Sequence, residues 1–176
     1  MEGNRAGGRC PLSSTAAPWA PKVERSFKEV LYRFLEEVHC TKAALYLEVP
    51  ERGLTLAARY GFGRGDAPPE FLSADDPLAV AAGDLRGRPL VVNSASDAPA
   101  LERRLLEAGA HRLLLTPLME DARMVGLVDA RDKGGQQAFT VLRRQAVGNA
   151  HQVSAFFLDN FQEAFNRHSR TNEDCP

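Results

Sequence analysis

The sequence has 176 residues, 44% of them hydrophobic, and a formal net charge of −1. A chain of this size fits one domain with tails, and such a domain buries roughly 70% of its unfolded surface, so it needs no disulfide or metal. The near-zero charge, without an uninterrupted cluster of Lys and Arg, argues against nucleic-acid binding. No apolar run approaches the roughly 18–20 residues of a membrane span, and the N-terminus lacks a signal-peptide core, so we expect a cytoplasmic protein.

Both ends of the chain lack hydrophobic periodicity. Residues 1–21 are rich in Gly, Ser, Ala and Pro, which predicts a flexible arm, and residues 168–176 are expected to form a disordered tail. Trp19 is the one anchor candidate in the arm. It either covers the edge of the domain, the interpretation that we favour, or binds a partner. Residues 22–167 are expected to form the domain.

The first part of the domain predicts a helix followed by a hairpin. Residues 23–39 carry apolar side chains at spacings of three and four, the pattern of an amphipathic helix. Two apolar runs, 43–49 and 54–60, are joined by a short turn with proline and glycine, which predicts a β-hairpin. The segment 61–65 (GFGRG) leads into prolines and not into a helix, so it does not match a phosphate-binding loop. It is predicted to be a mobile loop over a pocket or a sheet edge.

Short elements fill the middle of the chain. Asp76, followed by a proline, predicts the start of a short helix that runs through Ala82. Residues 88–93 predict a short strand, and the proline in its second position favours a sheet edge. Residues 99–108, which end before a glycine, predict another helix.

A second hairpin is the centre of the predicted sheet. The apolar runs 112–118 and 124–131 are separated by the polar turn 120–123. Neither run alternates cleanly between apolar and polar residues, so helices should cover both faces of the sheet.

Three residues of the second run stand out. Gly126 should cost roughly 0.5–1 kcal/mol relative to alanine, so a close approach or a bend is expected there. Asp129 and Arg131 share one face of the strand. They could pair with each other, or Asp129 could bind a ligand.

The last helix is expected over residues 141–167, with Thr140 as its cap. At 1.5 Å per residue it would be roughly 40 Å long, whereas a domain of about 130 residues is about 36 Å across. Its Phe-rich end therefore needs a cover, for which a second copy of the protein is the simplest candidate. The expected dimer interface on the first and last helices comprises Phe27, Leu31, Phe34, Val153, Phe157 and Phe161.

This order of elements resembles the GAF domain family over residues 23–157. The most telling segments, by their order and spacing together, are 87–93 (GRPLVVN), 114–118 (LLTPL), 124–128 (MVGLV) and 139–140 (FT). The resemblance implies an α+β, PAS-related fold with an antiparallel sheet of five to six strands in the order 2-1-5-4-3. Helices would cover both faces, with a long C-terminal helix, and a small-molecule pocket would lie under loops and short helices.

The family includes bilin-binding light sensors, cyclic-nucleotide binders, haem and iron sensors, and a methionine sulfoxide reductase that uses cysteines. Cys40 is the only one of the three cysteines inside the predicted domain, so we expect neither covalent bilin nor a reductase cysteine pair. Cys40 itself is predicted to be a small buried apolar residue. The cysteines and histidines lack metal-ligand spacing, so no metal is expected. No serine has a pairing with a histidine that can be read from the sequence, so no catalytic residues are expected.

The expected ligand pocket draws on the end of the second strand, the short helix and the central hairpin. Its residues would be Tyr60, Phe62, Asp75, Asp76, Arg112, Leu114 and Asp129. The favoured function is a dimeric, non-catalytic signalling module whose affinity for a partner protein changes when an unidentified small molecule binds. The alternative is a scaffold whose pocket is filled by its own side chains and which binds only a partner protein.

Overall fold

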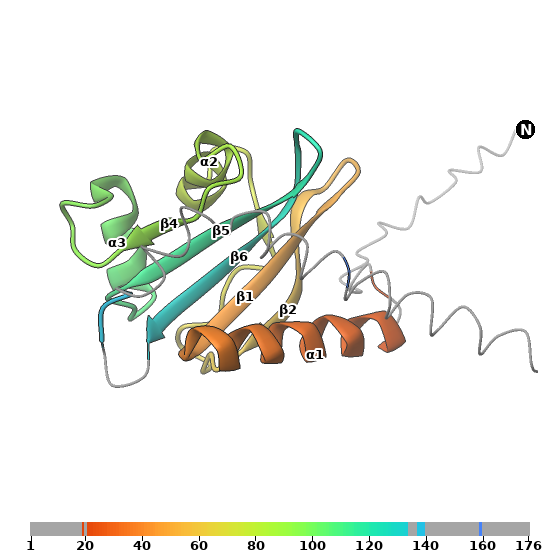
Figure 1. Ribbon diagram of the computed structural model, residues 1–176, viewed down its shortest axis with the longest axis horizontal. Coiled ribbons are helices and arrows are strands. Elements are labelled where there is room, and N and C mark those ends of the chain that lie inside the picture. The colour runs from red at the N-terminus through yellow and green to blue at the C-terminus, as the bar shows by residue number, and fades with distance from the viewer. Residues whose placement is uncertain (1–18, 20, 134–136, 140–158, 160–176) are drawn as a thin grey trace, which may run out of the picture.

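The structure is a computed structural model that describes residues 19, 21–133, 137–139 and 159 (Figure 1). Each element predicted within this part of the chain is present, with ends that differ by a few residues. In chain order the elements are α1 (Pro21–Val38), β1 (Cys40–Val49), β2 (Gly53–Tyr60), β3 (Phe71–Leu72), α2 (Pro77–Asp84), β4 (Leu90–Val92), α3 (Pro99–Glu107), β5 (Leu113–Glu120) and β6 (Arg123–Lys133).

The strands form one antiparallel sheet in the order β3-β2-β1-β6-β5-β4. Without β3, the other five strands numbered along the chain have the expected order 2-1-5-4-3. The difference is the two-residue strand β3, which pairs with Leu54 and Thr55 of β2 and adds one edge strand. At the opposite edge lies β4, as the proline at its start predicted.

Helix α1 covers one face of the sheet, the α1 face, while α2 and α3 cover the other, the α2–α3 face (Figure 1). The two faces hold separate apolar clusters, because successive side chains of a strand point to opposite sides. Leu45 and Val128 pack with α1, whereas Tyr46 and Leu127 pack with the short helices. The expected helices on both faces are therefore confirmed.

The apolar stripe of α1 lies inside the subunit. Phe27, Leu31 and Phe34 are only 7%, 1% and 3% exposed and belong to the core cluster of the α1 face. These three residues, expected to contact a second copy, instead hold α1 on its own sheet. The spacing of the apolar residues predicted a buried stripe, but it could not predict whether the protein's own sheet or a second copy covers that stripe. The other expected interface residues, the predicted helix 141–167 and the tail 168–176 lie outside the described residues, except for residue 159.

Trp19 covers the edge of the domain. Its ring meets the ring of Phe27 edge-on with centroids 5.2 Å apart. Its indole N–H donates to the carbonyl of Leu56 on β2 at 3.4 Å. The interpretation that we favoured for Trp19 is thus confirmed.

The central hairpin has a tighter turn than the sequence indicated. Glu120 pairs with Arg123 as the last rung of the β5–β6 ladder, so only two residues form the turn. The close approach expected at Gly126 is confirmed, since a Cβ there would lie 2.5 Å from the carbonyl oxygen of Tyr46. A methyl group would force β6 away from β1 at the centre of the sheet. No helix in the part of the chain that the structure describes is long and apolar enough to cross a membrane.

Candidate functional site

An ion pair is buried on the α2–α3 face of the sheet. Asp129 and Arg131 lie two residues apart on β6 and are 0% and 2% exposed. The guanidinium Nε lies 2.9 and 3.0 Å from the two carboxylate oxygens of Asp129, and Nη2 lies 2.6 Å from Oδ2. Of the two alternatives that the sequence left open for Asp129, the structure shows the pair with Arg131. Its forked geometry is typical of strong charge-assisted contacts.

Tyr46 lies beside this pair on the neighbouring strand β1 and is fully buried. Its hydroxyl donates to the backbone carbonyl of Pro69 at 3.2 Å. Burial raises the pKa of Tyr46 well above its usual range, and the carboxylate of Asp129 raises it further, whereas the guanidinium of Arg131 opposes the shift. The phenol therefore stays protonated and acts as a hydrogen-bond donor.

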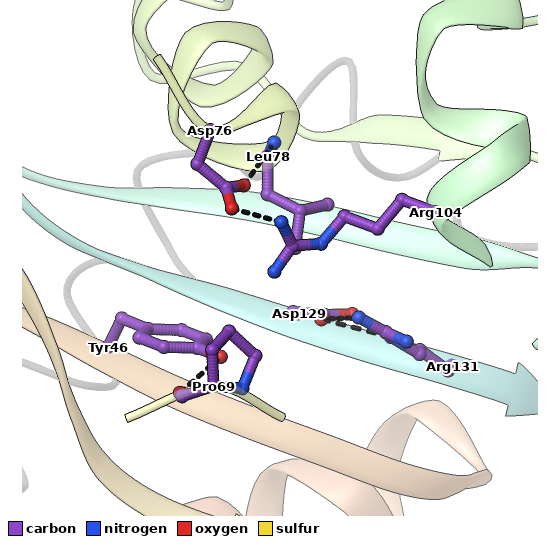
Figure 2. A network of polar contacts seen from close by, with 7 residues as sticks. All are labelled: Tyr46, Pro69, Asp76, Leu78, Arg104, Asp129 and Arg131. Carbon is purple, nitrogen blue, oxygen red and sulfur yellow. Dashed lines mark hydrogen bonds and ion pairs between the residues drawn. The ribbon is translucent and has the colours of Figure 1, made fainter. Parts of the chain in front are cut away.

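A second ion pair joins the two helices above the sheet (Figure 2). Asp76 is the N-cap of α2, and its Oδ1 accepts a hydrogen bond from the backbone N–H of Leu78 at 2.9 Å. Its Oδ2 accepts from Nη1 of Arg104 on α3. The N-cap predicted at Asp76 is confirmed, and the same carboxylate also fastens α2 to α3.

The segment between β2 and β3 reaches the buried pair through Phe62. The ring centroid of Phe62 lies 5.7 Å from Cζ of Arg131, within the range of a cation–π contact. The same segment is tied to β1 by Asp66, whose carboxylate lies 2.5 Å from Nζ of Lys42 and also accepts from the N–H of Gly63. As predicted, this glycine-rich segment holds no helix.

The charges of this cluster balance one another. Burial disfavours the charged form of Arg131, but the carboxylate of Asp129 outweighs this effect, and the net result is a raised pKa for Arg131. Among the described residues, no buried side-chain nitrogen or oxygen lacks a hydrogen-bond partner. Two guanidinium groups, two carboxylates and a phenol thus form a closed polar layer between the sheet and the helices.

The structure brings together three of the seven expected pocket residues, namely Phe62, Asp76 and Asp129. Two others lie on the α1 face: Leu114 is buried in its core cluster, and the ring of Tyr60 lies 5.7 Å from that of Tyr32 on α1. These two cannot share a cavity with Asp129.

The last two expected residues lie apart from the polar layer. Asp75 is exposed, and a hydrogen bond from Ser73 lowers the pKa of its carboxyl group. Arg112 is partly exposed just before β5, and its carbonyl accepts a hydrogen bond from the backbone of Asp132.

Three members of the polar layer were not among the expected pocket residues: Arg131, which the sequence offered only as a pairing partner, and Tyr46 and Arg104, which it did not single out. For Tyr46 a signal was available, because its hydroxyl lies within the otherwise apolar run 43–47 and needs a partner. For Arg104 there was none, since an arginine on a short helix normally faces solvent. Cys40 packs against the α1-face cluster, as expected for a small apolar residue, but it is partly exposed and not buried as predicted.

No group of three or more His, Cys, Asp and Glu side chains able to hold a metal ion is found within the residues that the structure describes.

The fold has clear counterparts among solved structures. No family model matches the sequence, and no curated protein matches it. The GAF domain/HD domain protein of Geobacter sulfurreducens is 18% identical with a TM-score of 0.55, over 77% of this chain and 94% of that chain. The PixJ GAF domain of Thermosynechococcus elongatus, in its blue-light absorbing form, is 14% identical with a TM-score of 0.57, over 89% and 95%.

A third similar structure is NreA from Staphylococcus aureus, mutated in its nitrate-binding site. It is 18% identical with a TM-score of 0.52, over 65% of this chain and 88% of that chain. At such identities the likeness concerns the fold. Together with the six-stranded antiparallel sheet and its two helical layers, these neighbours identify the chain as a GAF-fold domain.

Proposed function

We propose that this chain is a non-catalytic regulatory module that binds a small molecule between the sheet and helices α2 and α3. The observation that carries the proposal is the buried ion pair between Asp129 and Arg131. Removing two charges from water is costly, and apolar residues of similar volume often stabilise a core as well or better. A charged pair buried between the sheet and the helices is therefore better explained by recognition than by stability.

The state of the polar groups supports a non-catalytic role. The carboxylates of Asp129 and Asp76 are each held by a guanidinium group, and Tyr46 keeps its proton. Both carboxylates already accept hydrogen bonds from a guanidinium group, so neither is free to receive a proton from a substrate, as a general base must. The nitrate-binding site of NreA, a structure of the same fold, supports binding of a small molecule. Ligand binding would then change the affinity for a partner protein in the cytoplasm.

The module is further proposed to form a homodimer through its first and last helices. Support comes from the length expected for the last helix, roughly 40 Å against a domain about 36 Å across. Since Phe27, Leu31 and Phe34 are buried within the subunit, α1 would contribute its outer side. Tyr32, 46% exposed, would lie at the edge of that contact, because its ring also meets the ring of Tyr60 on β2.

Sedimentation equilibrium at tens of micromolar tests the dimer. Phe157→Asp and Phe161→Asp should each shift the wild-type dimer to monomer. Val80→Asp on α2, at a residue that is 48% exposed on the opposite face, should leave the dimer intact. A monomeric wild-type protein would contradict the proposal.

A second candidate function is a protein-interaction scaffold without a ligand. The complete pairing of the buried side-chain polar atoms in the described residues favours a scaffold, because none of these atoms needs a ligand to complete its hydrogen bonding. In that case the polar layer would serve only to fix α2 and α3 on the sheet.

Native mass spectrometry and amide NMR separate the two functions. A ligand-binding module should retain a small molecule from the cell, or shift the amide signals of β6, α2 and α3 when a metabolite panel is added. A bare chain whose signals in these elements do not respond to the panel would favour the scaffold.

A further inference from the structure

The ion pair of Asp129 and Arg131 also indicates which class of molecule would bind. We infer that the ligand is a small zwitterion, with a carboxylate and a cationic amine on neighbouring atoms as in an α-amino acid; this inference rests on the proposed function. The ligand would insert between the two side chains, so that its carboxylate binds Arg131 and its amine binds Asp129.

Charge balance in the polar layer is the first argument. Asp76 and Asp129 carry two negative charges, and Arg104 and Arg131 carry two positive ones, so the layer is neutral. A simple anion bound to Arg131 would leave the Asp129 carboxylate buried without a partner. A simple cation bound to Asp129 would leave the Arg131 guanidinium buried without a partner. An unpaired buried charge is strongly unfavourable. A zwitterion pairs both halves and keeps the layer neutral.

The geometry of the donors is the second argument. Arg131 directs Nε and Nη2 at the two oxygens of Asp129, at distances of 2.6–3.0 Å. A ligand carboxylate has the same two oxygens and the same charge, so it can take over these hydrogen bonds without rearranging the guanidinium. Asp129 then occupies, in the ligand-free protein, the place of the ligand carboxylate.

The cover of the pair is the third argument. Phe62, which is partly exposed, lies over the guanidinium of Arg131 and comes from the segment between β2 and β3. Its ring offers an apolar contact to the body of a ligand whose charged end enters the pair. The positive φ of Gly61, +77°, lets the chain turn there so that Phe62 reaches back over β6.

The experiment compares three probes on the full-length wild-type protein. The twenty common amino acids are titrated calorimetrically, and the best binder is compared with its deamino carboxylic acid and its decarboxylated amine. The amino acid should bind about 30-fold or more tightly than either analogue, as expected for the loss of one partner of a buried charge pair. Equal binding of the amino acid and its deamino acid would overturn the inference, as would no binding by any amino acid.

Substitutions at the pair add a specificity readout. In Asp129→Asn the preference for the amino acid over its deamino acid should disappear, because the partner of the amine is gone. Arg131→Lys retains the positive charge but loses the two-pronged hydrogen bonding of the guanidinium group. The affinities for the amino acid and for its deamino acid should therefore both fall. Arg123→Gln, at the first residue of β6 in an exposed pair with Glu48 on β1, is the matched control and should bind like wild type. Unchanged selectivity in Asp129→Asn would contradict the inference. If this variant does not fold, the comparison of the three probes on the wild-type protein still tests the inference.

The outcome also separates this inference from the proposed function. A non-zwitterionic metabolite that shifts the amide signals of β6, α2 and α3, and whose affinity does not depend on Asp129, would refute the inference and leave the ligand-binding module intact. No response of these elements to any small molecule would refute both.

Discussion

Asp76 and Arg104 join the start of α2 to the middle of α3, and the carboxylate of Asp76 serves two partners at once. One oxygen caps α2 through the N–H of Leu78, and the other receives the guanidinium of Arg104. Both helices lie over the buried pair of Asp129 and Arg131 (Figure 2). Asp76 therefore holds the cover of the proposed ligand site in place.

The two roles of Asp76 can be separated by substitution. Asp76→Asn keeps an acceptor for the cap and removes the charge, whereas Asp76→Ala removes both. We expect Asp76→Ala to be less stable than Asp76→Asn by about 1 kcal/mol, the usual value of an N-cap, in urea unfolding. Hydrogen exchange at residues 77–84 should accelerate more in the alanine variant, and equal exchange in the two variants would contradict the capping role.

Breaking the buried pair should be far more damaging than replacing it. Asp129→Ala should cost about 3–5 kcal/mol because it leaves Arg131 charged and buried without its partner. The double variant Asp129→Leu/Arg131→Met should recover most of this loss in chemical denaturation. For comparison, Glu24→Gln should change stability by less than about 0.5 kcal/mol, because its pair with Lys28 is exposed. Additive losses in the double variant would argue against the coupling.

Gly126→Ala should destabilise the sheet. The new methyl group would lie 2.5 Å from the carbonyl oxygen of Tyr46 and 2.9 Å from a methyl carbon of Leu47. We expect a loss of about 1–3 kcal/mol, as for overpacking elsewhere. Gly83→Ala is the matched control, because nothing lies within 4 Å of its added Cβ and alanine favours the helix by about 0.5–1 kcal/mol. Equal thermal midpoints for the two variants would contradict this account.

Alkaline pH should weaken the fold through Tyr46. Its pKa in the folded state lies above the ordinary value of 10.0, so the folded protein keeps the phenolic proton where the unfolded chain has lost it. The stabilisation is therefore fully present below about pH 10 and is lost as pH rises through the folded pKa, by up to about 1.4 kcal/mol per pH unit. Denaturation between pH 9 and 11 should show a flatter slope for Tyr46→Phe than for wild type.

The local elements could be predicted because each depends on neighbours in the chain. The aspartate–proline sequence at Asp76 started a helix, the proline at the head of β4 marked an edge strand, and Gly126 indicated a close approach between strands. Strand alternation placed Asp129 and Arg131 on one face, since side chains two apart share a face, and so made their pairing one of two possibilities.

The faces of the other site residues could not be predicted in this way. Leu54 and Tyr60 are six residues apart, so a regular strand would place both on the α2–α3 face with the pocket. The register shift between β1 and β2 leaves Ala57 without a partner, since Leu45 pairs with Ala58 and Tyr46 with Leu56. This extra residue reverses the alternation, and Tyr60 lies on the α1 face against Tyr32.

The sequence by itself determined where the helices and strands of the described residues lie, except for β3, because periodicity and turn chemistry act over a few residues. The order of the five main strands was implied by the resemblance to the GAF family, and strand alternation offered Arg131 as one of two candidate partners of Asp129, a ligand being the other. Only the tertiary structure decided that Arg104 reaches Asp76, that Tyr46 donates to Pro69, and that α1 buries its phenylalanines in its own subunit. Those contacts join segments about 20 to 100 residues apart. They form only when the helices pack on the two faces of the sheet, and local periodicity does not specify that packing.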